Sequence, residues 1–219
     1  MATDKFIDIH THNETADSHT ISVVNKDMTG WGRSDKQSPD TYFSVGIHPW
    51  KVTPNWKEHI PIVENMAKHP DVLMVGECGL DKVHGECDME LQKEVFRWHI
   101  LLSERLEKPL LIHCVKAFDE LFRIKKETAP QQLWIVHGFR GKKEQAIQLM
   151  RNGIELSFGE RFNEDALHEA YECNKLWIET DDKQIRIESV YDVISDKLNC
   201  PVGQLADRMR TKFLRVFGK

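Results

Sequence analysis

Residues 109–137, PLLIHCVKAFDELFRIKKETAPQQLWIVH, contain one complete strand–helix–strand repeat. Its two apolar runs, PLLIHC (109–114) and LWIVH (133–137), are short and rich in aliphatic and aromatic residues, which is typical of buried strands. Between them, residues 117–126 carry apolar side chains at helical spacing. This order predicts two parallel strands joined by a crossover helix.

The same repeat extends along the whole chain. Further apolar runs are FIDIH (6–10), TISVV (20–24), YFSVG (42–46), VLMVG (72–76), IELSF (154–158) and LWIE (176–179), which makes eight in all. Helical patterns occupy 57–68, 88–106, 142–151, 163–173, 187–197 and 202–217. Eight such strands predict an α/β protein with a shortened (β/α)8 TIM-type barrel, formed by a single domain over 1–219. The alternative, a doubly wound open sheet, would favour a GxGxxG motif after the first strand, and the sequence has none.

The connection between the second and third strands departs from this pattern. Residues 25–41, NKDMTGWGRSDKQSPDT, offer only Met28 and Trp31 as large apolar side chains, and Gly30 and Gly32 each disfavour a helix by roughly 1 kcal/mol. We therefore expect an irregular connection over 27–40 instead of a helix. Trp31 would cover the flank of these strands or form a subunit contact.

Composition excludes several classes of protein. The net charge of −5 is opposite to the strong basic balance of proteins that coat DNA non-specifically. The five cysteines are scattered and never form a CxxC pair, which argues against a disulfide framework or a zinc ribbon. No apolar run approaches the roughly 20 residues that span a bilayer, so no membrane partner is expected. The first residues lack the features of a signal peptide, and we expect a cytoplasmic location.

Polar residues of metal-ligand type stand where the predicted strands end. His10 and His12 are two residues apart, so an extended chain places both on one side. Other strands are followed or closed by Glu77, His113, His137 and Asp181. Each residue alone has an ordinary structural explanation, such as a core histidine or a helix cap. Together they stand at five of the eight strand ends, which converge on one mouth in a barrel, and they suit two divalent ions.

These stretches resemble the TatD-like metal-dependent hydrolases, a family often described as deoxyribonucleases. The similar segments, in family order, are FIDIHTH, VGIHPW, VGECGLD, LQKEVFRWHILLSERLEKPLLIHC, VHGF, ELSFG and IETDD. A looser similarity covers CPVGQLADRMRTKFLRVFG near the C-terminus. The resemblance implies a barrel with a dinuclear metal site.

The resemblance also implies residue roles. One ion would be held by His10, His12, Glu77 and Asp181, and the other by Glu77, His113 and His137. Asp181 and Glu77 would be the catalytic residues. His48 would contact substrate, although a loop histidine before a proline turn explains it equally well. Asp8, Asp81 and Glu179 would orient the ligating imidazoles, or cap helices and pair with lysines instead.

The chain departs from the family pattern around the substrate. Lys116 stands where the family commonly has Arg, and it lacks the planar fork that grips a phosphate. Arg140, in HGFRG, replaces a Ser, and Lys183 and Lys212 replace a Pro and an Asn. Lys116 and Arg140 are candidate substrate contacts. The cluster of Arg140 with the neighbouring lysines at 142 and 143 would attract anions, or would simply be a solvated helix start.

The expected reaction is metal-assisted hydrolysis, with zinc, manganese or magnesium as the cation. A first ion would activate water, a second would polarise the scissile oxygen, and Asp181 would move the proton. The expected substrate is a phosphodiester in DNA, a short oligonucleotide or a small phosphoester. The alternatives are amidohydrolase-type cleavage of a C–N or C–O bond in a small molecule, and a non-catalytic protein that retains the metal. Glu77 weighs against the amidohydrolases that use a carboxylated lysine as the bridge.

Overall fold

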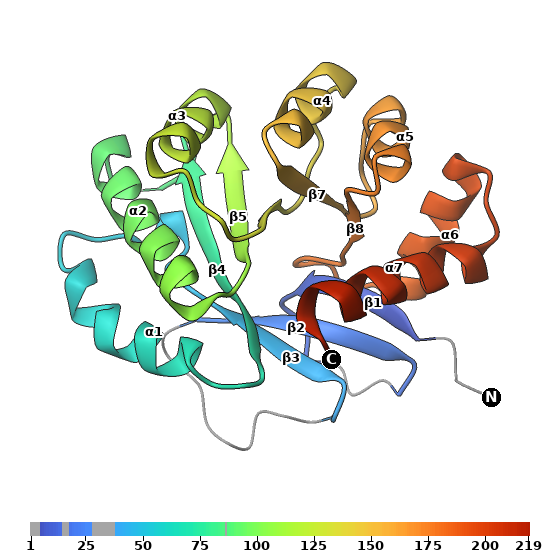
Figure 1. The fold of residues 1–219 in the computed structure, drawn as a ribbon, viewed down its shortest axis with the longest axis horizontal. Coiled ribbons are helices and arrows are strands. Elements are labelled where there is room, and N and C mark those ends of the chain that lie inside the picture. Colours follow the sequence, from blue (N-terminus) through green and yellow to red (C-terminus); the bar gives the residue numbers. More distant parts are fainter. Residues whose placement is uncertain (1–4, 15–17, 28–37, 86) are drawn as a thin grey trace. The chain divides into compact units, whose positions relative to one another are not determined.

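The computed structural model describes residues 5–14, 18–27, 38–85 and 87–219. Its strands follow one another in the sheet in chain order, the order of a (β/α)8 fold (Figure 1). The strands are β1 (Phe6–Thr11), β2 (Thr20–Lys26), β3 (Thr41–Val45), β4 (Val72–Asp81), β5 (Leu110–Val115), β6 (Trp134–Val136), β7 (Ile154–Phe158) and β8 (Leu176–Ile178). All eight predicted strands are confirmed.

The helices also lie where the apolar spacing predicts them. They are α1 (Ile60–Ala67), α2 (Met89–Leu106), α3 (Phe118–Thr128), α4 (Lys143–Arg151), α5 (Glu164–Glu172), α6 (Ile187–Leu198) and α7 (Val202–Phe217), with short 3-10 turns η1 (Pro49–Lys51) and η2 (Trp56–His59). The start of α2 shows a local cause: the Asp88 side chain accepts a hydrogen bond from the Leu91 N–H and satisfies an amide that the helix leaves unpaired.

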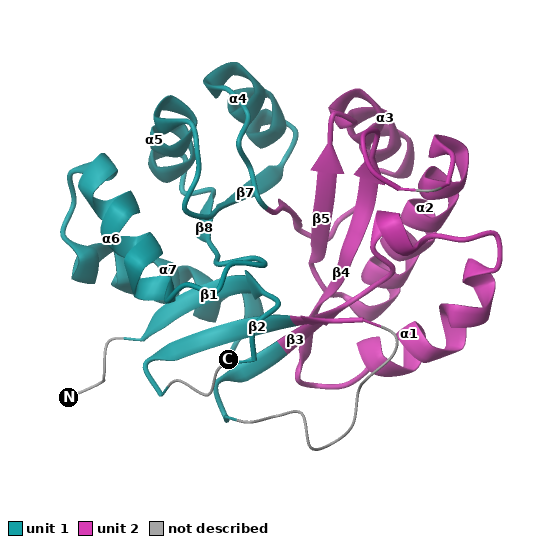
Figure 2. Cartoon of the chain, turned by 180° about the vertical axis from the view of Figure 1, so that it is seen from behind, with its two compact units in different colours: residues 1–24, 34–42, 138–219 teal, residues 25–33, 43–137 magenta. Residues whose placement is uncertain are grey.

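The chain divides into two compact units, coloured separately in Figure 2. Unit 2 comprises residues 25–33 and 43–137, and in it β3, β4, β5 and β6 pair in parallel, in that order. Helix α2 packs on β4 and α3 on β5. The aromatic rings of Phe96 and Trp134 meet edge to face at 5.5 Å in its core. This unit therefore has its own buried sheet and helix layer.

Unit 1 comprises residues 1–24, 34–42 and 138–219, so it draws on both ends of the chain. Strand β1 pairs with β2, and β7 pairs with β8, all in parallel. The buried Tyr191 of α6 fastens that helix to β1, because its hydroxyl donates to the Ile7 carbonyl and accepts from the Ile7 N–H. A bridge between Thr11 and Asp181 joins β1 to the segment after β8.

The end of the fourth strand differs from the prediction. Strand β4 continues to Asp81, so Glu77 lies inside the strand instead of after it. The β4–β5 register shifts between Val75 and Cys78, which gives this part of the strand an irregular course. The sequence places Glu77 after the strand because apolar spacing does not mark where pairing stops. His113 lies within β5, two residues before its end, inside the predicted run 109–114.

The predicted irregular connection over 27–40 falls largely on residues 28–37, which lie outside the described residues, as does Trp31. The absence of a helix there stays a prediction. The flanking strands β2 and β3 lie where the sequence places them. Among the described helices, none is both long enough and apolar enough to cross a membrane.

Candidate metal centre

Three histidine side chains of unit 2 converge on one carboxylate oxygen. The Glu77 Oε1 atom lies 2.7 Å from His137 Nε2, 3.0 Å from His113 Nδ1 and 3.0 Å from His48 Nε2. Glu77 is buried, and the three histidines are mostly buried, so the cluster lies largely out of water. Each side chain comes from or just after a different strand: β3, β4, β5 and β6.

The irregular part of β4 sets the position of Glu77. Gly76 has φ +137°, and a Cβ there would lie 2.3 Å from the Leu111 carbonyl oxygen, so only glycine allows β4 to approach β5 this closely. The Glu77 N–H then donates to Asn25 Oδ1, which also accepts from the Ser44 hydroxyl. Asn25 was not predicted as part of the site, because a single polar residue at the end of a strand carries no motif.

The spacing of the donor atoms fits a metal ion. His113 Nδ1 lies 3.3 Å from His137 Nε2, and it is also 3.3 Å from His48 Nε2. Tetrahedral ligands at metal–nitrogen distances of about 2.1 Å would be separated by about 3.4 Å. The potential ligand atoms of His48, Glu77 and His113 all lie within 4.8 Å of one another. The donor set of unit 2 therefore fits a divalent cation such as zinc.

Asp81 contacts the ring of His113, the role that the family resemblance implies. The His113 Nε2–H donates to Asp81 Oδ2 at 3.0 Å, which leaves the Nδ1 lone pair facing the cluster. Asp81 itself is held by Gln92, whose amide group bonds the backbone of Asp81 twice. Burial raises the pKa of Asp81, but hydrogen bonds from the His84 N–H, the Trp50 indole and His113 outweigh it and hold the pKa well below its usual value. Asp81 therefore stays ionised.

The ring nitrogen of His48 that faces the cluster carries a proton, whereas the nitrogen of a histidine that binds a metal does not. Its Nδ1 accepts a hydrogen bond from the Trp50 N–H at 3.2 Å. In the neutral ring the proton must then sit on Nε2, the atom that faces Glu77. Burial lowers the pKa of His48, although Glu77 opposes the shift, so the neutral form is favoured. His48 is thus built as a hydrogen-bond donor, which agrees with the predicted contact to substrate better than with a metal ligand.

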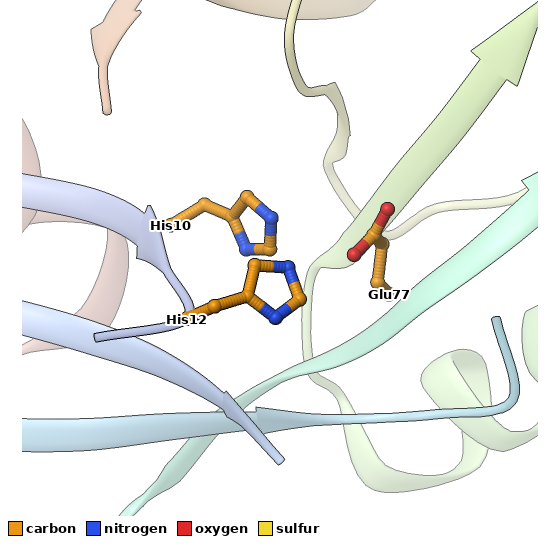
Figure 3. Close-up of side chains that lie close together, drawn as sticks. All are labelled: His10, His12 and Glu77. Carbon is orange, nitrogen blue, oxygen red and sulfur yellow. The ribbon is translucent and has the colours of Figure 1, made fainter. Parts of the chain in front are cut away.

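Unit 1 holds a second set of candidate ligands. His10 and His12 lie with their rings edge to face, with centroids 5.1 Å apart, side by side in Figure 3. Asp181 Oδ1 lies 3.4 Å from His10 Nε2 and 3.7 Å from His12 Nε2. His10 is completely buried, whereas the His12 side chain is 42% exposed. The structure therefore brings these three predicted residues together.

Backbone pairing places Asp181 beside the two histidines. The Asp181 N–H donates to the His10 carbonyl, and the His12 N–H donates to the Asp181 carbonyl. Asp181 adopts φ +57°, an uncommon conformation for a residue with a side chain. The Asp8 carboxylate holds this segment, because it accepts hydrogen bonds from the Thr180 N–H and the Thr180 hydroxyl. Burial raises the pKa of Asp8 to about 7. Asp8 therefore holds the segment before Asp181.

The remaining predicted residues lie near strand ends. Glu179 Oε1 accepts from the Gly138 N–H at 2.5 Å, within unit 1. Lys116 follows β5 with φ +52°, and Arg140 follows β6 and is exposed. Lys143, a member of the proposed basic cluster, pairs with Glu169 at 2.7 Å, so part of that cluster is already neutralised.

Comparison with known proteins agrees with these features. Residues 16–218 match the family model described as TatD related DNase, a span that contains the whole unit 2 cluster and Asp181 and begins after His12. An uncharacterized metal-dependent hydrolase, YabD of Bacillus subtilis, is 32% identical over 119 residues, which cover 54% of this chain and 47% of the relative. A protein of Erwinia tasmaniensis named 3'-5' ssDNA/RNA exonuclease TatD is 27% identical over 121 residues, with the same coverage. The chain thus spans about half the length of these relatives.

Solved structures share the fold. YJJV, a TatD homolog from Escherichia coli, superposes with a TM-score of 0.83 at 19% identity and is covered completely, as is this chain. A TatD family hydrolase from Entamoeba histolytica superposes with a TM-score of 0.73 at 16% identity, over 97% of this chain and 98% of that one. The family match extends over most of the chain, and the chain belongs to the TatD related DNase family.

Proposed function

We propose that this protein is a metal-dependent hydrolase that cleaves phosphodiester bonds. The observation that carries the proposal is the unit 2 cluster. His113 Nδ1 and His137 Nε2 lie 3.3 Å apart, the spacing of metal ligands, and both contact Glu77 Oε1, while Asp81 orients His113. A carboxylate behind a ligating histidine is a recurrent feature of metal sites. Membership of the TatD related DNase family supports the same chemistry.

Two divalent ions are proposed, with zinc, manganese or magnesium as candidates. His113 and His137 with Glu77 would hold one ion, and His10, His12 and Asp181 would hold the other, with Glu77 as the shared ligand that the family resemblance implies. An anionic carboxylate between two cations relieves their repulsion. Bound divalent ions supply hydroxide near neutral pH, because they lower the pKa of water from 15.7 to about 7.

The protein's own groups would position the reactants and move protons. The His48 Nε2–H is oriented by the Trp50 N–H and would donate to a substrate oxygen. Asp181 would accept the proton of the attacking water on its carboxylate and return it to the leaving oxygen. Asp81 keeps His113 in the tautomer that ligates. Glu77 is the second residue to which we assign a catalytic role, through the ligands that it organises.

Single-stranded DNA, a short oligonucleotide or a small phosphoester is the proposed substrate. Relatives named 3'-5' ssDNA/RNA exonuclease support a nucleic acid. The overall charge of −5 gives no general attraction to DNA, so recognition would rest on the metal ions and on local contacts, with Lys116 and Arg140 as candidates. A cytoplasmic location agrees with such a substrate and stays a prediction.

The test combines metal analysis with a panel of substrates. The full chain is stripped with chelator, reloaded separately with zinc, manganese or magnesium, and its metal content is measured by elemental mass spectrometry. Hydrolysis is then followed on end-labelled single-stranded DNA, on bis(p-nitrophenyl) phosphate and on p-nitrophenyl acetate. We expect about two ions per chain and metal-dependent cleavage of the two phosphodiesters.

The matched control is His168→Asn, because His168 is an exposed histidine on α5 that belongs to neither ligand set. This variant should keep full activity, whereas His113→Asn should lose it. Cleavage of p-nitrophenyl acetate without cleavage of either phosphodiester would replace the proposal by the amidohydrolase alternative. A chain that binds the ions and cleaves none of these substrates would be a metal-holding protein instead.

A further inference from the structure

Trp50 is a large, half-exposed side chain beside the unit 2 cluster of Glu77 and its histidines. It lies in η1, two residues after His48, and 50% of its surface is accessible. Its indole N–H donates to Asp81 Oδ2 at 2.7 Å, the same oxygen that accepts from His113 Nε2. The indole is therefore fixed in place by the carboxylate that orients the predicted metal ligand.

The surrounding rings hold the indole at a defined angle. The His48 and His113 rings stand at 86° and 76° to it, with centroids at 4.9 and 5.8 Å. On the β4–α2 loop, His84 lies 5.2 Å away at a tilt of 50°, next to Val83, which is also 50% exposed. Trp50 and Val83 thus place apolar surface beside a group of polar side chains, and ligand sites commonly combine apolar lining with a few polar groups.

Two lysines that are neighbours in the sequence of Trp50 and Asp81 are already paired. Lys51 contacts Asp27 at 2.7 Å, and Lys82 contacts Glu120 at 2.8 Å. Their charge is therefore partly neutralised before any phosphate arrives. A planar apolar group is a better match for this rim than another phosphate, because the indole already lies fixed and loses little conformational entropy when a ring stacks on it.

We propose that Trp50 is a stacking platform for the nucleobase that adjoins the scissile phosphate. The inference rests on the proposed phosphodiesterase function and names its substrate class: a nucleic acid end whose terminal base is unpaired. Stacking on an aromatic side chain accepts every base, since each has a π-face, and therefore gives binding without sequence preference. A base within a duplex is already stacked on its neighbours, so this platform would select single strands.

The experiment compares two oligonucleotides that differ only in the terminal bases. One is a normal single strand, and the other carries tetrahydrofuran abasic residues at both ends. The enzyme variants are wild type, Trp50→Leu, Trp50→Phe and the control Leu101→Ala, which removes an exposed apolar side chain from the middle of α2. For each combination of protein and oligonucleotide, kcat/KM of cleavage is measured, and the dissociation constant is measured by fluorescence anisotropy. Thermal unfolding confirms that the variants fold.

We expect wild type and Leu101→Ala to prefer the normal end by about tenfold in both quantities. Trp50→Leu should abolish this preference, and Trp50→Phe, which keeps a ring without the N–H donor, should retain most of it. An equal loss on both oligonucleotides in Trp50→Leu would overturn the proposal, because Trp50 would then act only through Asp81. Wild type without any base preference would overturn it as well, while leaving hydrolysis itself established.

The two proposals fail in different ways. If neither oligonucleotide is cleaved, the proposed phosphodiesterase function is wrong, and the binding measurement alone tests whether a base stacks on Trp50. Tighter binding of the normal end that disappears in Trp50→Leu supports stacking even then. Equal binding of the normal and the abasic oligonucleotide by the wild-type protein excludes stacking on Trp50.

Discussion

The two units arrange their candidate ligands in different ways. In unit 2 the histidine nitrogens lie 2.7 to 3.0 Å from one buried oxygen of Glu77, and Asp81 orients one of the rings. In unit 1 the Asp181 oxygen lies 3.4 and 3.7 Å from two histidines, one of which is partly exposed. The unit 2 side chains come from a single continuous segment, 43–137, whereas the unit 1 set joins β1 to a residue 169 positions after His12.

The two sets of candidate ligands are held in place by different kinds of hydrogen bond. The unit 2 set is fixed by side-chain hydrogen bonds that converge from neighbouring parallel strands. The unit 1 set is fixed by backbone bonds between β1 and the segment after β8, which hold Asp181 in a left-handed conformation. We therefore expect unit 2 to provide the tighter cation site and unit 1 to provide the group that moves a proton.

Glu77→Gln should have the largest effect. The glutamine side chain keeps the shape of glutamate but lacks the negative charge that attracts the cations. Cleavage should therefore fall to background. Elemental analysis sharpens the comparison between the units. Loss of both ions identifies Glu77 as a shared ligand, and loss of one ion confines Glu77 to unit 2. Unchanged metal content and activity would refute its role in either unit.

Asp181→Asn should lower turnover about 10²- to 10⁴-fold while most of the bound metal remains, because an amide oxygen cannot take the proton of water. Steady-state kinetics on bis(p-nitrophenyl) phosphate measures the effect, and circular dichroism checks the fold. Asp182→Asn is the matched control, since its exposed carboxylate pairs with Lys183 at the surface. Near wild-type turnover in Asp181→Asn would show that the proton moves by another route.

Asp81→Asn should weaken metal binding or activity by about 10- to 100-fold, the usual effect of removing a group behind a ligating histidine. The amide can donate to His113 Nε2, which would favour the tautomer with its proton on the wrong nitrogen. Competition with a chromogenic chelator gives the metal affinity. If Asp81→Asn bound metal as tightly as wild type, the ligand assignment of His113 Nδ1 would be wrong.

The smallest expected effect concerns stability in acid. His99 of α2 is completely buried, accepts from the Ile47 N–H and contacts the Val95 carbonyl, and burial lowers its pKa to about 4. The unfolded chain, with a histidine pKa near 6.5, binds more protons in this range, so stability is complete above pH 6.5 and is lost as the pH falls towards 4. Between pH 7 and 5 this residue alone should remove about 2 kcal/mol of unfolding free energy.

The measurement is urea unfolding at several pH values. His99→Gln is the comparison, because its amide oxygen can still accept from the Ile47 N–H and does not titrate. The variant should show a flatter acid dependence than wild type. Parallel curves for the two proteins would mean that the pKa of His99 is the same in the folded and the unfolded chain.

Sequence reasoning found the elements because their signals are local. The alternation of apolar runs and helical spacing located all eight strands, and the strand ends located His10, His12, Glu77, His113, His137 and Asp181. The family resemblance added roles and the orienting function of Asp81. Asn25, Gln92 and Trp50 were missed as parts of the site, because each acts through a contact with a residue distant in the chain.

The (β/α)8 order and the set of candidate ligands follow from the sequence, since both depend on residue type and spacing along one chain. The orientation and protonation of those side chains depend on the tertiary structure. His113 Nε2 donates to Asp81, so its Nδ1 atom faces the cluster. The Trp50 N–H donates to His48 Nδ1, so the His48 ring presents its Nε2–H as a donor. The tertiary structure also leaves the Trp50 indole exposed above a buried carboxylate. Tautomer, exposure and orientation arise from neighbours in space, and no periodicity in the sequence encodes them.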